Sequence, residues 1–187
     1  MGAGIGRKRR AGNVPRLWLL SDPARLPDPR AAALRLPRGS AVLARGVAPA
    51  LLPGLALLCR QRGLRLLVGG DARAALALGA GLHVPERGAP GLAAFLLARR
   101  PGALLSVAVH GRAGLARARR LGADAVLISP VFPTRSHPGA PALGLHAWAW
   151  MARHAARPAV ALGGVDARSA RRLPRIARGF AAISWFL

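Results

Sequence analysis

Hydroxyl and imidazole side chains follow a short apolar run in the second half of the chain. Residues 125–131 are apolar and short enough to form a buried strand, and residues 132–139 are of types that suit a hydrogen-bonding loop. Thr134 and Ser136 supply hydroxyl groups there, and His137 supplies an imidazole that can donate or accept a proton. The pattern predicts a buried strand that carries a mobile, hydrogen-bonding loop to one face of an α/β fold.

A second apolar run, residues 158–162, ends in the pair Gly163-Gly164. Bare glycine backbone lets N–H groups approach an anion, and the helical segment expected next would add the partial positive charge of a helix N-terminus. A plain strand-to-helix turn would use the same glycines. We interpret the pair as a phosphate site, with Ser184 beside it at the end of the next apolar segment.

Acidic residues are scarce, six against 29 basic ones, so their positions are informative. Four of them lie at or just after the ends of apolar segments: Asp22, Asp71, Glu86 and Asp166. Three of the five histidines lie at the same kind of position: His83, His110 and His137. This grouping indicates a site. Turn or helix-cap roles would also account for Asp22, Asp71 and Asp166, and burial in the core would account for His83 and His110.

The elements that must position these groups are eight short apolar segments, most of them separated by an Ala/Leu/Arg stretch with helical periodicity. The predicted strands are residues 17–21, 41–45, 64–68, 81–84, 104–109, 125–131, 159–162 and 180–184. Continuous apolar strands that alternate with helices are typical of a parallel sheet covered by helices. Eight such units predict an α/β fold of the TIM (βα)8 barrel type.

The predicted barrel is short for its class, because the eighth strand runs into Trp185-Phe-Leu187 and leaves no residues for an eighth helix. We expect residues 16–187 to form the barrel domain and residues 1–15 to form a basic, disordered tail. A barrel without its last helix would expose an apolar wall between its first and last strands. The tail or a second copy of the chain in a homo-oligomer would cover that wall.

Composition restricts the class of protein further. The chain has 187 residues, 52% of them hydrophobic, and a net charge of +23, yet only Lys8 among the basic residues is lysine. The arginines spread over every helix and aromatic residues are few, so we expect no specific nucleic-acid partner. The single cysteine, Cys59, permits no internal disulfide, which favours a reducing cytoplasm. No apolar run is long enough for a membrane span, and the basic start lacks the apolar core of a secretory signal.

Several motifs resemble the thiamine phosphate synthase family, including its TenI-like thiazole tautomerases. Ser129-Pro-Val-Phe-Pro-Thr134 is similar to that family's Gly-Pro-[Val/Ile]-Phe-x-Thr, and Ala161-Leu-Gly-Gly-Val165 is similar to Ala-Ile-Gly-Gly-Ile. Ala182-Ile-Ser184 resembles Val-Val-Ser, and Leu19-Leu-Ser-Asp22 resembles the opening Val-Thr-Asp. The resemblance extends from about residue 17 to residue 187 with the motifs in the family's order.

The resemblance implies a cytoplasmic enzyme of thiamine biosynthesis, a transferase that joins a hydroxymethylpyrimidine diphosphate to a thiazole phosphate and releases pyrophosphate. It assigns the thiazole phosphate to Gly163, Gly164 and Ser184, with Ile183 as a further substrate-binding residue, and closure of the site to Thr134, Ser136 and His137. Arg45, His83 and His110 would face the pyrimidine diphosphate, with Arg45, His110 and His137 as the catalytic candidates. Asp71 and Glu86 are the candidate Mg²⁺ ligands.

The chain departs from the family pattern mainly on the pyrophosphate and metal side. Gly69-Gly70 replaces Asn-Asp after the third strand, and Leu43, Val47 and Ala108 replace the family's glutamine, lysine and serine. Two alternatives to the synthase therefore stay open: a metal-independent thiazole tautomerase, and a degenerate barrel that binds a phosphorylated thiamine precursor without turnover. Pro130 occupies the position of the histidine that the tautomerases use as acid and base.

Overall fold

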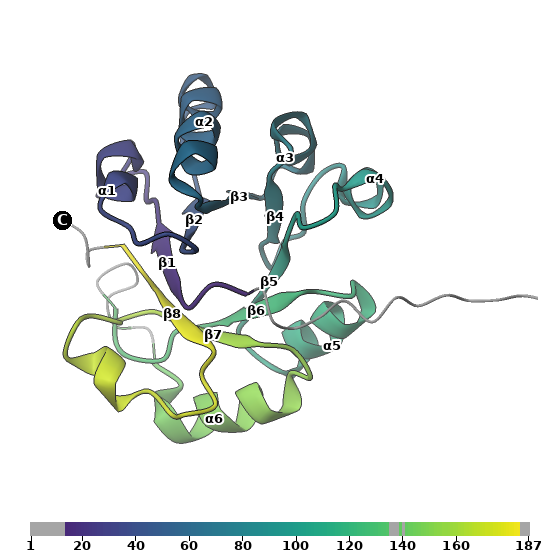
Figure 1. The fold of residues 1–187 in the computed structure, drawn as a ribbon. Helices are drawn as coiled ribbons and strands as arrows, with labels where there is room; N and C mark the ends of the chain where they lie inside the picture. Colours follow the sequence, from purple (N-terminus) through teal and green to yellow (C-terminus); the bar gives the residue numbers. More distant parts are fainter. Residues whose placement is uncertain (1–13, 135–138, 140, 184–187) are drawn as a thin grey trace, which may run out of the picture.

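The computed structural model describes residues 14–134, 139 and 141–183. Eight parallel strands pair in sequence order and close into a barrel, as the sequence predicts (Figure 1). The strands are β1 Leu17–Leu20, β2 Ala41–Ala44, β3 Arg65–Gly69, β4 Gly81–Val84, β5 Leu105–Val109, β6 Ala125–Ile128, β7 Ala159–Leu162 and β8 Gly179–Ala182. Strand β6 ends before Pro130, which has no N–H to donate to a ladder.

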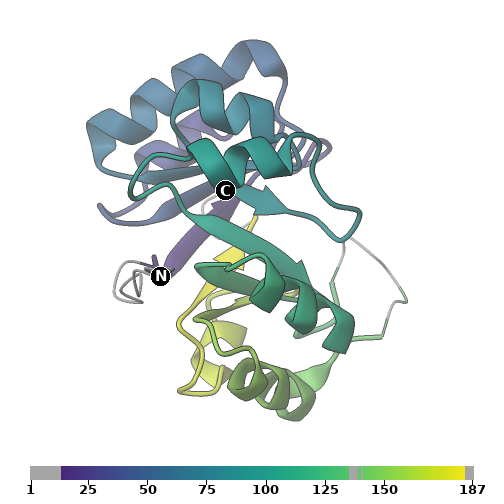
Figure 2. The ribbon, with the colours of Figure 1, turned by 90° about the vertical axis from the view of Figure 1, so that its right-hand side faces the viewer.

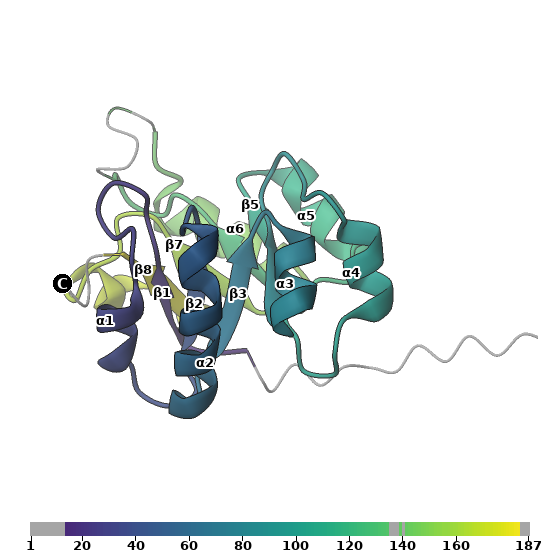
Figure 3. The same cartoon turned by 90° about the horizontal axis from the view of Figure 1, so that it is seen from above.

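Helices follow the first six strands and lie around the outside of that part of the barrel (Figure 1). They are α1 Arg30–Leu34, α2 Leu52–Arg62, α3 Ala72–Leu78, α4 Leu92–Ala98, α5 Arg112–Arg120 and α6 Gly144–His154, with a 3₁₀ turn, η2 Pro49–Leu51, before α2. Helices α1 to α4 lie next to one another along one side (Figure 3), and α5 and α6 cover the other (Figure 2). None of the described helices is long and apolar enough to cross a bilayer.

Two apolar clusters hold the barrel together, one inside it and one between its wall and the helices. Alternate strand residues point inward, so Trp18, Leu43 and Leu127 fill the interior with at most 1% exposure. Trp148 of α6 is fully buried in the outer cluster and donates its indole N–H to the carbonyl of Ile128 at 3.1 Å. This bond fixes α6 against β6.

The barrel closes where β8 meets β1, and a glycine makes this closure possible. The N–H of Phe180 donates to the carbonyl of Arg16 at 2.9 Å. A Cβ on Gly179 would lie 2.0 Å from the same carbonyl oxygen, so only glycine fits. Val14 is 3% exposed, and its carbonyl accepts a bond from Arg178 Nε at 2.9 Å. Residues 14 and 15, which we assigned to the tail, therefore pack with the barrel; residues 1–13 lie outside the described part.

The last two β/α units are reduced. Between β7 and β8 the chain forms only a 3₁₀ turn, η3 Ser169–Arg172, and no helix follows β8 within the described residues. The wall that we expected to be exposed is largely covered within one chain, because Leu19 is fully buried and Ala182 is 4% exposed. Leu17 and Phe180 are half-buried. A homo-oligomer that covers the rest of this wall stays a prediction.

Candidate active site

The predicted site residues that the structure describes lie at the carboxyl ends of the barrel strands. Because all eight strands are parallel, these ends share one face, the face where TIM-barrel active sites form. Arg45 follows β2, His83 lies in β4, His110 follows β5, and the glycine pair follows β7. The sheet therefore gathers groups that are far apart in the sequence.

Arg45 is held in place by Asp22. Its Nη2 donates to Asp22 Oδ2 at 2.9 Å, and its backbone N–H donates to the Ser21 hydroxyl at 2.6 Å. The pKa of the Asp22 carboxyl lies below its usual value. Burial raises this pKa, but hydrogen bonds from the Arg25 side chain and from the N–H groups of Arg25 and Ala24, together with the Arg25 charge, lower it by more. Asp22 is thus an anion that aims Arg45, beyond the turn role that the sequence suggested.

His83 is a neutral, buried histidine. It is 7% exposed, and its Nδ1 lies 2.9 Å from the Ser106 hydroxyl of β5. Burial, followed by electrostatic repulsion from Arg45, Arg117 and His110, lowers the pKa of His83 to about 3. At neutral pH the ring can therefore donate or accept a hydrogen bond but cannot supply a positive charge to a diphosphate.

His110 is exposed, in contrast, and its tautomer is fixed by one bond. Its Nδ1 lies 2.9 Å from the carbonyl oxygen of Ser129, which can only accept, so Nδ1 carries the hydrogen. The Ser129 hydroxyl lies 3.3 Å from the same nitrogen. In the neutral ring, Nε2 is then the basic nitrogen, and no hydrogen bond joins it to another described residue, so it can act as a proton acceptor.

The two glycines after β7 adopt left-handed backbone, with φ of 94° at Gly163 and 65° at Gly164. A Cβ on Gly163 would lie 2.7 Å from Pro130 Cβ, and a Cβ on Gly164 would lie 2.3 Å from Pro133 O. The N–H of Phe132 donates to the carbonyl of Gly163 at 3.1 Å. The loop after β6 therefore packs directly on one side of the glycine pair.

The other side of the pair is accessible from solvent. Both glycines are partly exposed, and among the described residues no acceptor takes the N–H of Gly163 or Gly164. The predicted helix N-terminus is wrong, however, since only η3 follows. Asp166 Oδ1 accepts the N–H groups of Arg168 at 2.9 Å and Ser169 at 2.7 Å, which closes a turn instead. An anion here would rely on the glycine amides.

The remaining predicted substrate residues are described only in part. Thr134 and Ile183 are partly exposed. Ser136, His137 and Ser184 lie outside the described residues, so the cradle of Gly163, Gly164 and Ser184 stays a prediction. Arg172 of η3 lies over the ring of Phe132, with its Cζ 5.6 Å from the ring centroid. This contact joins η3 to the loop that follows β6.

The two candidate Mg²⁺ ligands are carboxylates, which suits a hard cation, but one of them already has a structural role. Asp71 Oδ1 accepts the N–H of Ala74 at 2.9 Å and caps α3. Glu86 is exposed in the loop after β4. The described residues contain no group of three or more His, Cys, Asp or Glu side chains that could hold a metal. A Mg²⁺ ion would need substrate oxygens to complete its shell, which is usual for Mg²⁺ bound to phosphates.

Arg117 is a residue of this region that sequence reasoning missed. From α5 its guanidinium donates to the carbonyl of Glu86 and, at 2.8 Å, to the carbonyl of Ala108. It thereby connects the loop after β4 to β5, and its charge helps to keep His83 neutral. Nothing in the sequence separates it from the other arginines of the helices.

The closed parallel barrel, with arginine, histidine and glycine amides at the carboxyl ends of its strands, defines a TIM-barrel protein with its candidate site on the usual face. The pattern of the family described as thiamine monophosphate synthase matches residues 49–186. The chain belongs to this family, as its motifs suggested.

The chain is also similar to individual proteins with related names. A protein of Geobacter sulfurreducens is 39% identical over 126 residues, 65% of this chain and 58% of the relative. The thiamine-phosphate synthase of Chloroflexus aurantiacus is 34% identical over 131 residues, 68% of this chain and 59% of that enzyme. The chain thus spans less than two thirds of the length of either relative. The thiamine phosphate pyrophosphorylase from Pyrococcus furiosus has the same fold, with a TM-score of 0.74 at 23% identity over 92% of this chain and 87% of that one.

Proposed function

We propose that the protein is a thiamine phosphate synthase, which joins hydroxymethylpyrimidine diphosphate to a thiazole phosphate. The observation that carries the proposal is the glycine pair after β7. The amides of Gly163 and Gly164 lie at the carboxyl face, partly exposed and without an acceptor among the described residues. Backbone amides in left-handed glycine turns bind phosphate groups well.

In the proposed reaction the thiazole nitrogen forms a bond to the pyrimidine methylene carbon while the bond from that carbon to pyrophosphate breaks. The bonding electrons leave with pyrophosphate, so negative charge develops there. Arg45, aimed by Asp22, is the cation that supports this charge. His83, held neutral, is available to hydrogen-bond the substrate. Mg²⁺ held by Asp71 and Glu86 would neutralise further charge on pyrophosphate.

A tautomerase is the second candidate, and His110 is the observation in its favour. An isomerisation of the thiazole needs a group that takes a proton from one atom and returns it to another. The exposed Nε2 of His110 is such a group, because Nδ1 is committed to Ser129. This candidate needs no metal.

One set of assays separates these candidates. The purified protein is incubated with both phosphorylated precursors and Mg²⁺, with and without EDTA, and separately with the thiazole tautomer alone. Metal-dependent formation of thiamine phosphate supports the synthase, and tautomer conversion that EDTA leaves unchanged supports the isomerase. Binding by calorimetry without turnover would support a barrel that only binds the precursor and would overturn the proposal.

Two variants sharpen the assay. Arg45→Gln should lower synthase turnover about a hundredfold, because it removes the cation beside the leaving group. Arg120→Gln removes the same charge from the exposed end of α5 and should leave turnover unchanged. Equal loss in both variants would show that net charge, and not Arg45, matters.

A further inference from the structure

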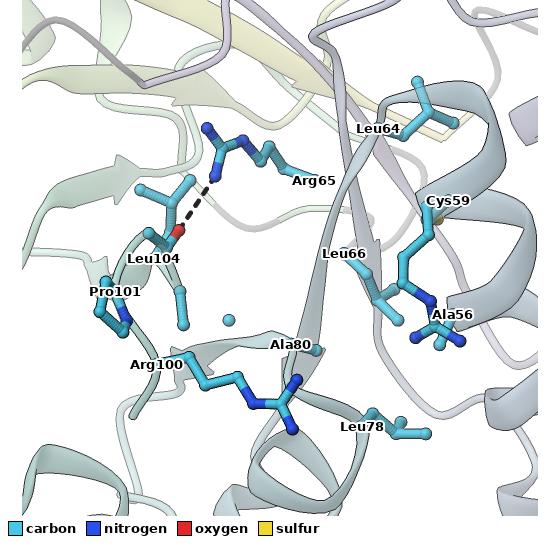
Figure 4. Close-up of a pocket in the computed structure, with 15 residues that line it drawn as sticks. Ala56, Cys59, Leu64, Arg65, Leu66, Leu78, Ala80, Arg100, Pro101 and Leu104 are labelled. Carbon is cyan, nitrogen blue, oxygen red and sulfur yellow. Dashed lines mark hydrogen bonds between the residues drawn. The ribbon is translucent and has the colours of Figure 1, made fainter. Parts of the chain in front are cut away.

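A cavity lies at the end of the barrel opposite the candidate active site, and Figure 4 shows the residues that line it. It has a volume of about 250 Å³ and is bounded by the last turn of α2, the start of β3, the turn between α3 and β4, and the segment before β5. These are the amino ends of the strands, whereas Arg45, His83 and the glycine pair lie at the carboxyl ends. The cavity is therefore separate from the candidate active site.

Three arginines line this cavity: Arg60, Arg65 and Arg100. No acidic residue is among its lining residues in the described part of the chain. Arg65 is fixed, since its Nη1 donates to the carbonyl of Gly102 at 3.1 Å (Figure 4). Arg100 lies over Gly79, where an added Cβ would be 3.0 Å from its Nη1. The cavity thus combines several positive charges with no internal counter-charge.

Helix ends account for only two of these arginines. Arg60 lies in the last turn of α2, and Arg100 covers Gly79, the C-cap of α3, so the helix dipoles favour both cations. Arg65 begins a strand, and its guanidinium turns toward the Pro101–Leu104 side of the cavity (Figure 4). Because Arg65 lines the same cavity as two other arginines and no acidic residue lines it in the described part of the chain, a bound anion would reduce the repulsion among these charges.

The rest of the cavity wall is apolar. Leu64, Leu66 and Leu78 line it together with small residues such as Ala56 and Ala80 (Figure 4). Arginine forks match phosphate oxygens, and a cavity of this size admits only a small ligand. We propose that this cavity binds a small phosphate monoester, with the phosphate on Arg65 and Arg100 and the ester group against the leucines. The proposal does not depend on the reaction at the other end.

The test is an NMR titration of the ¹⁵N-labelled full chain with phenyl phosphate, and separately with inorganic phosphate, at constant ionic strength set with chloride. Saturable shifts are expected at the amides of Gly79, Gly102 and Ala103. They should be distinct from any shifts at Gly163 and Gly164, which report the proposed active site. Phenyl phosphate should bind about threefold or more tightly than inorganic phosphate, because of the apolar wall.

Substitution locates the site. Arg65→Gln with Arg100→Gln should weaken phenyl phosphate binding at Gly79 and Gly102 about tenfold or more and leave the Gly163 and Gly164 shifts unchanged. Should the double variant fail to fold, Arg100→Gln alone provides the test, since this side chain is exposed.

A charge-matched control replaces two exposed arginines outside the cavity, Arg120→Gln with Arg175→Gln, and should leave binding intact. Shifts that rise linearly with phosphate concentration and occur near arginines throughout the chain would overturn the proposal. An equal loss of binding in the control variant would also overturn it. Either result would mean that the +23 charge attracts anions without a defined site. If phosphate produced no shifts at Gly163 and Gly164 in the unaltered protein but still shifted Gly79 and Gly102, this result would count against the proposed function and not against this cavity.

Discussion

Asp22 Oδ2 and Arg45 Nη2 form an ion pair at 2.9 Å that joins the chain just after β1 to the chain just after β2. The Asp22 side chain is 13% exposed and the Arg45 side chain is 41% exposed, so the carboxylate is the anchor and the guanidinium is the accessible partner. An anchored cation loses less freedom on binding an anion than a mobile one. This geometry makes Asp22 a positioning residue for Arg45.

Asp22→Asn should therefore lower kcat/KM for the pyrimidine diphosphate about tenfold, and weaken pyrophosphate binding by a similar factor. Steady-state kinetics and calorimetry with pyrophosphate measure the two effects. Asp28→Asn is the control, because it breaks the exposed Asp28–Arg30 pair of 2.7 Å and should change neither value. Weaker binding without any change in kcat would fit the positioning role, whereas unchanged binding would contradict it.

His83 should make stability fall as the pH drops. Its pKa in the folded protein is about 3, below the usual 6.5, so between these values the unfolded chain binds a proton that the folded chain does not. Stability due to the neutral ring is complete above about pH 6.5 and is lost progressively below it. Urea unfolding at about pH 7 and pH 5 measures the loss, and His83→Gln should reduce it.

Three carboxyl groups contribute little to the difference between pH 7 and pH 5. Asp22, Asp28 and Asp166 have pKa values below their usual value, so they stay ionised there. His146→Gln, at an exposed position, should keep the wild-type pH dependence. A His83 resonance that titrates near pH 6 by NMR would refute the buried neutral ring.

Gly164→Ala should destabilise the fold and abolish phosphate binding after β7. The alanine would have to hold φ near 65° and place its Cβ 2.3 Å from Pro133 O. Gly122→Ala separates the two effects, since Gly122 has a φ of 61° but nothing within 4 Å of an added Cβ. We expect about 1–2 kcal/mol for Gly122→Ala and about 1–3 kcal/mol more for Gly164→Ala, by thermal or urea unfolding. Equal losses would show that the loop after β6 can move away.

Gly179→Ala tests the closure of the barrel. Its Cβ would lie 2.0 Å from Arg16 O, so β8 could not approach the chain before β1. We expect a loss of about 3 kcal/mol or more of unfolding free energy, or failure to fold. Gly111→Ala, at an extended position with nothing within 4 Å, should change stability by about 0.5 kcal/mol or less. A stable Gly179→Ala protein would mean that the contact is not close.

The barrel could be predicted from sequence because its strands are short apolar runs separated by helical stretches. Residues 81–84 and 159–162 form strands with the predicted bounds. The helix expected after β7 fails because Asp166 and Ser169 take backbone partners for a turn, and Pro174 follows soon after. The periodicity of apolar residues cannot predict that these side chains will bind backbone groups and form a turn in place of a helix.

The site was less predictable than the fold. Arg45, His83 and His110 lie at or near the carboxyl ends of predicted strands, and these ends share one face because parallel strands share a direction. Position along a strand does not reveal that Asp22 pairs with Arg45, or that Arg117 is the arginine of α5 that reaches β5, because both depend on side-chain geometry. Composition adds no help when 29 basic residues are present.

Pairing of Leu17 with Phe180 has a consequence for how the protein is made. During translation, strands β1 to β7 emerge first and can begin to pair, but the ring cannot shut until residues 179–182 have left the ribosome. Until then the free edges of β1 and β7 are open to other nascent chains. Slow elongation or early release of the chain before β8 should therefore favour aggregation.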